Sequence, residues 1–218
     1  MIKAVLFDFD DTLGDRNGYA YLFYQSVLEK HFKDVCEDKI LKEAILQDMM
    51  MWEEKGDTNK NYPVEKACEK YQLIFPEGED FHEDFKNRIG DYSYLFDGAL
   101  ELIVELKKKY QVGLLTNGDA MGQRKKVSHA IDMDIFDYVF ISGDTPYRKP
   151  QKEMYEIVLK ATGLKPEEIM MVGDNFANDI YGALRMGMDA IWVTNKGNRL
   201  DNVEVKRVDS VLDIRKYL

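Results

Sequence analysis

Acidic, basic and hydroxyl side chains follow several short apolar runs, each within a few residues of the end of its run. Asp8 and Asp10 come directly after the first run, and their spacing points both carboxylates to the same side of an extended chain. Carboxylates gathered in one place repel each other unless a cation joins them. Mg²⁺ prefers oxygen ligands and often accompanies phosphates. The polar residues after the other runs are Thr116, Asn117, Lys149, Asp174 and Asp179.

Lys149, Thr116 and Asn117 complement such a metal with one fixed positive charge and two neutral donors. Metal, lysine and hydroxyl together suit a phosphoryl group, whose equatorial oxygens carry the charge of the transition state. Each signal alone has a commoner structural explanation, because aspartates in turns usually cap helices or face solvent. The joint arrangement, with each signal at the end of an apolar run, is what indicates a phosphate site.

Five apolar runs are predicted to be buried strands of a parallel sheet, since helix-like segments separate the later ones. Those segments cover residues 99–110, the stretch from Pro150 to Gly163, and the stretch from Asn178 to Met186. In an open α/β sheet, ligands bind at the carboxyl ends of the strands, where these polar residues would meet. The five runs are Ala4–Phe7, Val112–Leu115, Tyr138–Ile141, Ile169–Val172 and Ala190–Val193.

A long insertion interrupts this alternation after the first strand. About 100 residues separate the first two runs, far more than one crossover helix needs. Residues 16–92 show helical spacing and no strand pattern, so we expect a core of residues 1–15 and 93–218 and a helical insertion of residues 16–92. Hinges are expected near 13–14 and 95–98. The helical stripes are Tyr19, Leu22, Phe23 and Val27, then Ile40, Ala44, Ile45, Met49 and Trp52, then Phe81, Phe85 and Ile89.

Composition limits the class of protein further. The 218 residues are 45% hydrophobic and 32% charged, as in ordinary soluble globular proteins, and the net charge of −10 argues against a nucleic-acid partner. We expect no membrane span, because no run of ~18 apolar residues is present, and no signal peptide. Cys36 and Cys68 are expected to be free thiols in a reducing cytoplasm.

Four stretches, in this order, resemble the motifs of haloacid dehalogenase-like hydrolases. The resemblance covers the core outside the insertion and implies a Rossmann-like α/β sheet with an all-helical cap inserted after the first strand. It favours the phosphatase branch and Mg²⁺ as cofactor. The four stretches are Asp8-Phe9-Asp10-Asp11-Thr12-Leu13, Leu114-Leu115-Thr116-Asn117-Gly118, Lys149-Pro150, and Val172-Gly173-Asp174-Asn175 with Asn178-Asp179.

The resemblance also implies a role for each motif residue. Asp8 would be the nucleophile, and Asp10 would protonate the leaving oxygen and then activate water. Thr116 and Lys149 would hold phosphate oxygens, and Lys149 would also restrain Asp8. From its residue type and position, Asn117 is expected to bind the substrate as a further donor. The metal ligands would be Asp8, the backbone carbonyl of Asp10, and Asp174, with Asp179 supporting that metal shell.

Several alternatives stay open on the sequence. The dehalogenase branch needs no metal and lacks the second aspartate of the first motif, which this chain keeps as Asp10. A sugar-phosphate mutase shares the same core residues and differs mainly in its cap. Receiver-type signalling modules use similar residues, but they are smaller and have no cap. A catalytically inactive relative is disfavoured, because every motif residue is present.

The substrate is expected to be a small phosphorylated metabolite, with no nucleic-acid or membrane partner. The motif spelling resembles that of relatives acting on nucleoside monophosphates or acyl-sugar phosphates. Residues of the insertion should select the substrate, although a Met and Trp cluster at helical spacing is more often core. The candidates are Arg16, Asn17, Tyr19 and Tyr21, and further along the chain Met50, Met51, Trp52 and Lys55.

Overall fold

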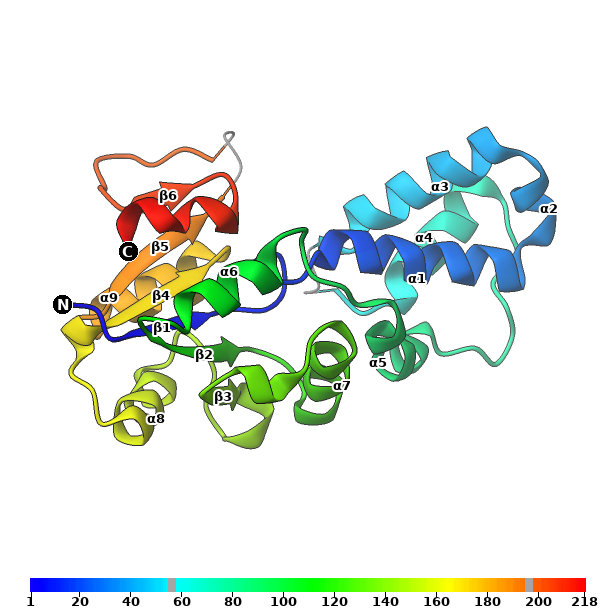
Figure 1. Ribbon diagram of the computed structural model, residues 1–218. Coiled ribbons are helices and arrows are strands. Elements are labelled where there is room, and N and C mark those ends of the chain that lie inside the picture. Colours follow the sequence, from blue (N-terminus) through cyan, green and yellow to red (C-terminus); the bar gives the residue numbers. More distant parts are fainter. Residues whose placement is uncertain (55–57, 195–197) are drawn as a thin grey trace. The chain divides into compact units, whose positions relative to one another are not determined.

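The computed structural model describes residues 1–54, 58–194 and 198–218, so Lys55 lies outside the described residues. The chain forms two compact units (Figure 1). One unit comprises residues 1–15 and 94–218 and is called the core unit below. The other comprises residues 16–93 and is called the helical unit.

The core unit is built on a six-stranded sheet of order β3-β2-β1-β4-β5-β6 in which every pair of neighbours is parallel. The predicted parallel α/β architecture is confirmed. From β1 the chain builds outward through β2 and β3 on one side and through β4, β5 and β6 on the other. The strand order therefore reverses between β1 and β4, which is the switch point where open sheets bind ligands. The strands are Ala4–Phe7, Gln111–Thr116, Tyr138–Ile141, Ile169–Gly173, Asp189–Val193 and Lys206–Val208.

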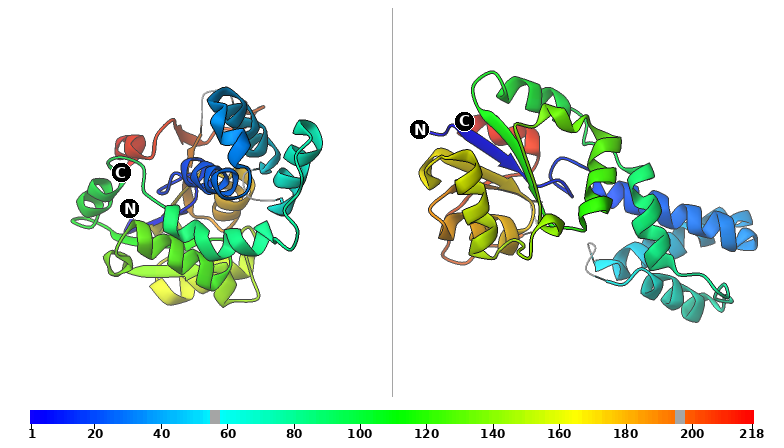
Figure 2. Two further views of the ribbon diagram at one scale, coloured as in Figure 1. Left: turned by 90° about the vertical axis from the view of Figure 1, so that its right-hand side faces the viewer. Right: turned by 90° about the horizontal axis from the view of Figure 1, so that it is seen from below.

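Central strands of this sheet are apolar throughout because helices cover both faces (Figure 2). Val5 and Phe7 of β1 point to one face, where α6 (Ala99–Leu106), α7 (Ala120–Ala130) and the C-terminal 3₁₀ helix (Val211–Tyr217) contribute to the core. Ala4 and Leu6 point to the other face, against α8 (Lys152–Thr162) and α9 (Gly182–Arg185). This alternation along β1 shows why buried parallel strands appear as continuous apolar runs.

Helix ends in the core unit differ in part from those expected. Helix α6 ends at Leu106, four residues earlier than predicted. Helix α8 ends as expected just before Gly163, which has φ +67°. The predicted helix 178–186 is a π-helix, Phe176–Tyr181, followed by α9. Strand β6 and helix α7 had no predicted counterpart. Further 3₁₀ turns cover Met133–Ile135, Ser142–Asp144 and Pro166–Glu168.

The helical unit has no strand among its described residues, as the sequence predicts. Tyr19 and Phe23 of the first helix lie in the core of this unit, and buried side chains of the later helices pack against these two residues. The apolar face of the third helix differs from the predicted stripe: Ile40 is 83% exposed, and Leu46 is buried instead. The helices are α1 Arg16–His31, α2 Lys33–Glu37, α3 Lys39–Trp52, α4 Asn61–Tyr71 and α5 Phe81–Tyr92.

Cys36 and Cys68 are both free. Among the described residues, no helix combines the length and the apolar character that crossing a membrane requires.

Candidate active site

Asp8 lies at the carboxyl end of β1, beside the switch point of the sheet. Its backbone N–H donates to the carbonyl of Val172 in β4 at 2.9 Å, which extends the β1–β4 pairing to the aspartate itself. The side chain is buried, and the residue is 7% exposed. After Asp8 the chain curls, with the N–H groups of Leu13 and Gly14 both donating to the carbonyl of Phe9. The tight loop therefore keeps the first motif at the edge of the sheet.

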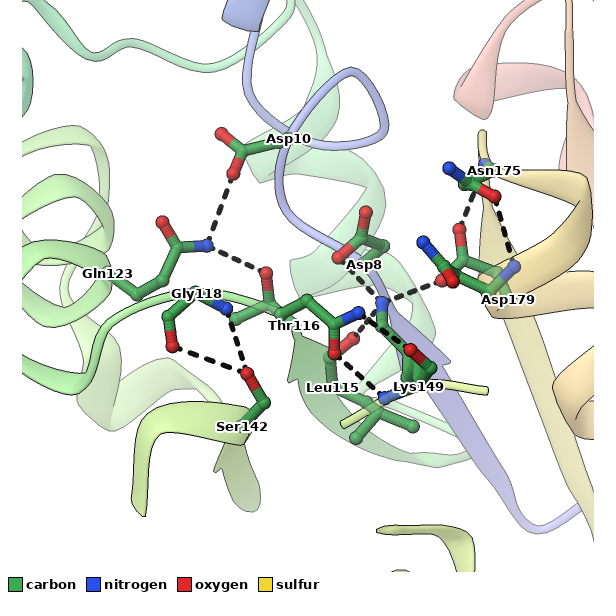
Figure 3. Close-up of polar contacts among 12 residues, drawn as sticks. Asp8, Asp10, Leu115, Thr116, Gly118, Gln123, Ser142, Lys149, Asn175 and Asp179 are labelled. Carbon is green, nitrogen blue, oxygen red and sulfur yellow. Dashed lines mark hydrogen bonds and ion pairs between the residues drawn. The ribbon is translucent and has the colours of Figure 1, made fainter. Parts of the chain in front are cut away.

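Lys149 reaches the same place from the loop after β3. Its Nζ donates to Asp8 Oδ1 at 2.9 Å, to Asp179 Oδ1 at 2.6 Å and to the backbone carbonyl of Leu115 at 2.7 Å (Figure 3). Burial alone would lower the pKa of Lys149, but the charges of Asp179 and Asp8 raise it above its usual value. The ammonium is therefore a permanent charge with each of its three protons directed at an acceptor.

Asp179 lies on the π-helix and is fully buried. Burial raises the pKa of its carboxyl, against the opposing attraction of Lys149. Its Oδ2 accepts the backbone N–H of Asn175 at 2.9 Å. A Cβ on Gly173 would lie 2.3 Å from Asp179 Oδ2, so this close approach of β4 to the π-helix requires glycine. The π-helix begins three residues after β4 ends, and this short connection places Asp179 beside Lys149.

Asp8, Asp174 and Asp179 form a group of carboxylates that could hold a metal ion, with one oxygen from each lying within 4.8 Å of the others. Three carboxylates against the one ammonium of Lys149 leave an excess of two negative charges when all are ionised. A divalent cation with oxygen ligands balances that excess. Asp174 is held by its backbone, because its carbonyl accepts the indole N–H of Trp192 at 2.7 Å.

Thr116 is the last residue of β2 and Asn117 follows it, so both lie at the strand end that the sequence predicts, and the two side chains have different partners. Asn117 Oδ1 accepts the N–H of Lys149 at 2.9 Å, and its Nδ2 donates to the carbonyl of Lys149 at 3.0 Å. This side chain thus pairs with the backbone of Lys149 in the manner of a strand neighbour. Thr116 is 1% exposed, and its Oγ1 accepts from Gln123 Nε2 at 2.8 Å.

Asp10 is turned toward α7. Lys126 Nζ lies 2.8 Å and 2.7 Å from its two carboxylate oxygens. Gln123 Nε2 donates to Oδ2 at 3.2 Å (Figure 3). Helix α7 begins at once after Gly118, with Asp119 accepting the N–H of Gly122 as its N-cap. One turn of helix then separates Gln123 from Lys126 and places both on the same face. Neither residue was singled out from the sequence.

The predicted residues therefore meet in two linked groups. Asp8, Asp174, Asp179 and Lys149 form the acidic group with its lysine, and Asn117 fixes the backbone of that lysine. Asp10 and Thr116 form a second group, joined through Gln123. Both groups lie at the carboxyl edge of β1, β2 and β4.

A parallel sheet of this order, covered by helices and with polar motifs at its switch point, defines the Rossmann-like α/β class, whose ligands bind at the carboxyl ends of the strands. The chain belongs to one family of that class, the haloacid dehalogenase-like hydrolases, whose family model matches residues 5–193.

Similar proteins span nearly the whole chain. A glyceraldehyde 3-phosphate phosphatase of Methanothermobacter thermautotrophicus is 31% identical over 98% of this chain and 96% of its own length. The human N-acylneuraminate-9-phosphatase is 26% identical over 90% of this chain and 84% of its own. Among solved structures, the putative hydrolase YfnB of Bacillus subtilis, described as bound to magnesium, has a TM-score of 0.76 at 22% identity, covering 99% and 98% of the two chains.

Proposed function

We propose that this chain is a Mg²⁺-dependent phosphatase that hydrolyses a small phosphomonoester through a covalent phosphate on Asp8. The observation that carries the proposal is the position of Asp8. It follows the central strand at the switch point, one oxygen faces Lys149, and two further carboxylates lie within reach of a shared cation. The phosphatases among the relatives add independent support.

In the first half of the reaction, an oxygen of Asp8 attacks phosphorus while the bond from phosphorus to the leaving oxygen breaks. Asp10 supplies the proton that the leaving alcohol needs, and becomes a carboxylate. Thr116 donates its hydroxyl to a phosphoryl oxygen, and Lys149 holds Asp8 in place by their 2.9 Å contact. A divalent cation held by the acidic group would neutralise charge on the phosphoryl oxygens and on those carboxylates.

In the second half, the carboxylate of Asp10 accepts a proton from water as that water attacks phosphorus. The bond from phosphorus to the Asp8 oxygen breaks, and inorganic phosphate is released with Asp8 restored as a carboxylate. The residues that would hold the metal are Asp8, Asp174 and the backbone carbonyl of Asp10, with Asp179 behind them. Asn117 acts in this proposal by fixing the Lys149 backbone that it contacts.

The substrate in this proposal is the phosphate ester of a small hydroxylated metabolite, such as a sugar phosphate. Two relatives are named for glyceraldehyde 3-phosphate and for a sialic acid 9-phosphate, both of which fit that class. The helical unit would select the substrate, because the core motifs contact mainly the phosphoryl group. The two free thiols fit a reducing compartment, so the proposal includes a cytoplasmic location.

The test combines the Asp8→Asn variant with metal removal. Wild-type protein should release phosphate from sugar phosphates with Mg²⁺, lose that activity in excess chelator and recover it on readdition. Acid-quenched wild-type protein should carry phosphate on the Asp8 peptide by mass spectrometry. Asp8→Asn should lower kcat by several orders of magnitude, roughly 10⁴-fold or more, with unchanged circular dichroism. Full turnover in chelator, or an active Asp8→Asn variant, would refute the proposal.

A further inference from the structure

Asp10 is held by two side chains of α7 that belong to none of the four motifs. Lys126 spans both carboxylate oxygens at 2.8 Å and 2.7 Å, and Gln123 contacts Oδ2 at 3.2 Å. A bidentate ammonium contact together with an amide donor fixes the direction of a carboxylate more tightly than a single hydrogen bond does. The arrangement parallels that of Asp8, because Asp8 and Asp10 each contact a buried lysine.

These contacts are built into the core unit. Gln123 is 4% exposed and Lys126 is 8% exposed, although both residue types usually extend into water. The neighbouring Arg124 and Lys125 on the same helix are exposed. Burying a lysine costs side-chain entropy and hydration, so its burial is sustained by the carboxylate that it meets.

Gln123 also connects Asp10 to the second motif. Its Nε2 donates both to Asp10 Oδ2 and to Thr116 Oγ1, the latter at 2.8 Å (Figure 3). The close packing of Gln123 requires the glycine before the helix, since a Cβ on Gly118 would lie 2.4 Å from Gln123 Cγ. One amide thereby sets the separation between Asp10 and the hydroxyl of Thr116.

We propose that Lys126 and Gln123 are positioning residues that orient Asp10 for proton transfer and fix its distance from Thr116. This inference rests on the proposed function. When Asp10 gives its proton to the leaving oxygen, the carboxylate that forms is held by Lys126 and Gln123. The same contacts then direct this carboxylate at the water from which it takes a proton when the aspartyl-phosphate is hydrolysed. Neither residue contacts phosphorus or the leaving group.

The test compares Lys126→Met with Lys125→Met, an adjacent exposed lysine of the same helix, and with Lys126→Arg. Each variant is assayed with an alkyl phosphate and with an aryl phosphate that has a good leaving group. Rapid quenching of these reactions measures the phosphoprotein. Lys126→Met should lower kcat for the alkyl ester by about 10- to 100-fold, a part of the usual 10²–10⁴-fold benefit of a positioned acid or base. Phosphoprotein should accumulate from the aryl ester, and the KM for that ester should fall together with kcat, because breakdown needs Asp10 as base and becomes rate-limiting.

Lys126→Arg should recover most of the activity, since a second cation can hold the same carboxylate, whereas Lys125→Met should match wild type. A raised KM at unchanged kcat would show that Lys126 binds substrate and would overturn the inference. An equal loss on both esters without phosphoprotein would also overturn it. If wild type fails to form phosphoprotein on Asp8, the proposed function fails. If wild type forms it and Lys126→Met behaves like Lys125→Met, only the positioning inference fails.

Discussion

Among single residues, Lys149 joins the end of β1 to the fourth motif through its contacts with Asp8 and Asp179. Its three protons face Asp8, Asp179 and the Leu115 carbonyl, so no proton is left for a phosphate oxygen in this arrangement. In the proposed reaction, the ammonium acts through its charge and through the position that it gives to Asp8. A carboxylate that is both restrained and partly neutralised is better placed to approach an anionic phosphate.

We therefore expect Lys149→Met to remove activity and stability together. Activity should fall by at least about 10²–10³-fold on every substrate, because the loss occurs at the phosphoryl site itself. The unfolding free energy should drop by about 3–5 kcal/mol, since two buried carboxylates lose their shared counter-charge. Steady-state kinetics and denaturant unfolding measure the two effects.

Lys152→Met is the matched control, because Lys152 forms an exposed ion pair with Glu156 on α8. It should change neither quantity measurably. A Lys149→Met variant that keeps more than a tenth of wild-type activity would contradict the role given to this lysine.

The site residues differ in how visible they are in the sequence. Asp8 and Thr116 are visible because each lies at the end of an apolar run that forms a strand. Gln123 and Lys126 carry no such signal, because a glutamine and a lysine on a helix ordinarily face solvent. Their partner Asp10 lies 113 and 116 residues away in the chain. Only the packing of α7 against the first motif brings them together.

Among the helices and strands, the elements that are buried most completely are the ones whose positions the sequence predicts best. Strands β1 and β4 are covered on both faces and form unbroken apolar runs, so their positions were predicted to within one residue. Strand β6 lies at the edge, spans three residues and contains two basic ones, which leaves no periodic signal. Helix α7 buries a single apolar side chain, Val127, and so lacks the apolar stripe of an amphipathic helix.

The helical unit contains its own buried ion cluster. Glu53, 1% exposed, accepts from Arg16 at 3.0 Å and 2.5 Å and lies 2.9 Å from Lys60 Nζ. Burial alone would raise the pKa of Glu53, but Arg16 and Lys60 lower it below its ordinary value. The cluster ties the first residue of α1 to the end of α3 and the start of α4.

This cluster should give the helical unit a pH-dependent stability. A lowered folded pKa means that the contribution of Glu53 is fully present above the ordinary glutamate pKa of 4.5 and is lost as pH falls through the folded value. Glu53→Gln should therefore cost about 3 kcal/mol of unfolding free energy near pH 7, with a difference from wild type that shrinks toward pH 3.

Urea unfolding followed by circular dichroism at several pH values measures that difference. The control is Glu69→Gln, an exposed partner of Lys66 on α4, which should have little effect at any pH. A pH-independent cost for Glu53→Gln would mean that its packing, and not its charge, stabilises the unit.

At the scale of the whole molecule, the helical unit leaves and re-enters the core unit at a single place. The N–H of Asp15 donates to the carbonyl of Tyr94 at 3.1 Å, and the hydroxyl of Tyr94 donates to Asp15 Oδ2 at 2.9 Å. Gly14 and Leu95 form an isolated antiparallel bridge just behind them. Because both crossings lie side by side, 78 residues are inserted without interrupting the sheet.

Within the helical unit, the residues near this connection divide into structural ones and one exposed candidate for substrate contact. Tyr19 is fully buried in the core of the unit, and Arg16 is engaged by Glu53, so both stabilise the unit. Asn17 is exposed and is the second residue of α1.

We expect Asn17→Ala to change kcat/KM for a sugar phosphate about tenfold and to leave kcat/KM for p-nitrophenyl phosphate nearly unchanged, since uneven losses mark contacts beyond the phosphoryl group. Tyr19→Ala should instead lower the unfolding free energy by about 3–5 kcal/mol and leave the ratio between the two substrates unaltered. Kinetics on both substrates, with thermal unfolding of each variant, separates the two effects. A uniform loss for Asn17→Ala would place substrate selection elsewhere in the helical unit.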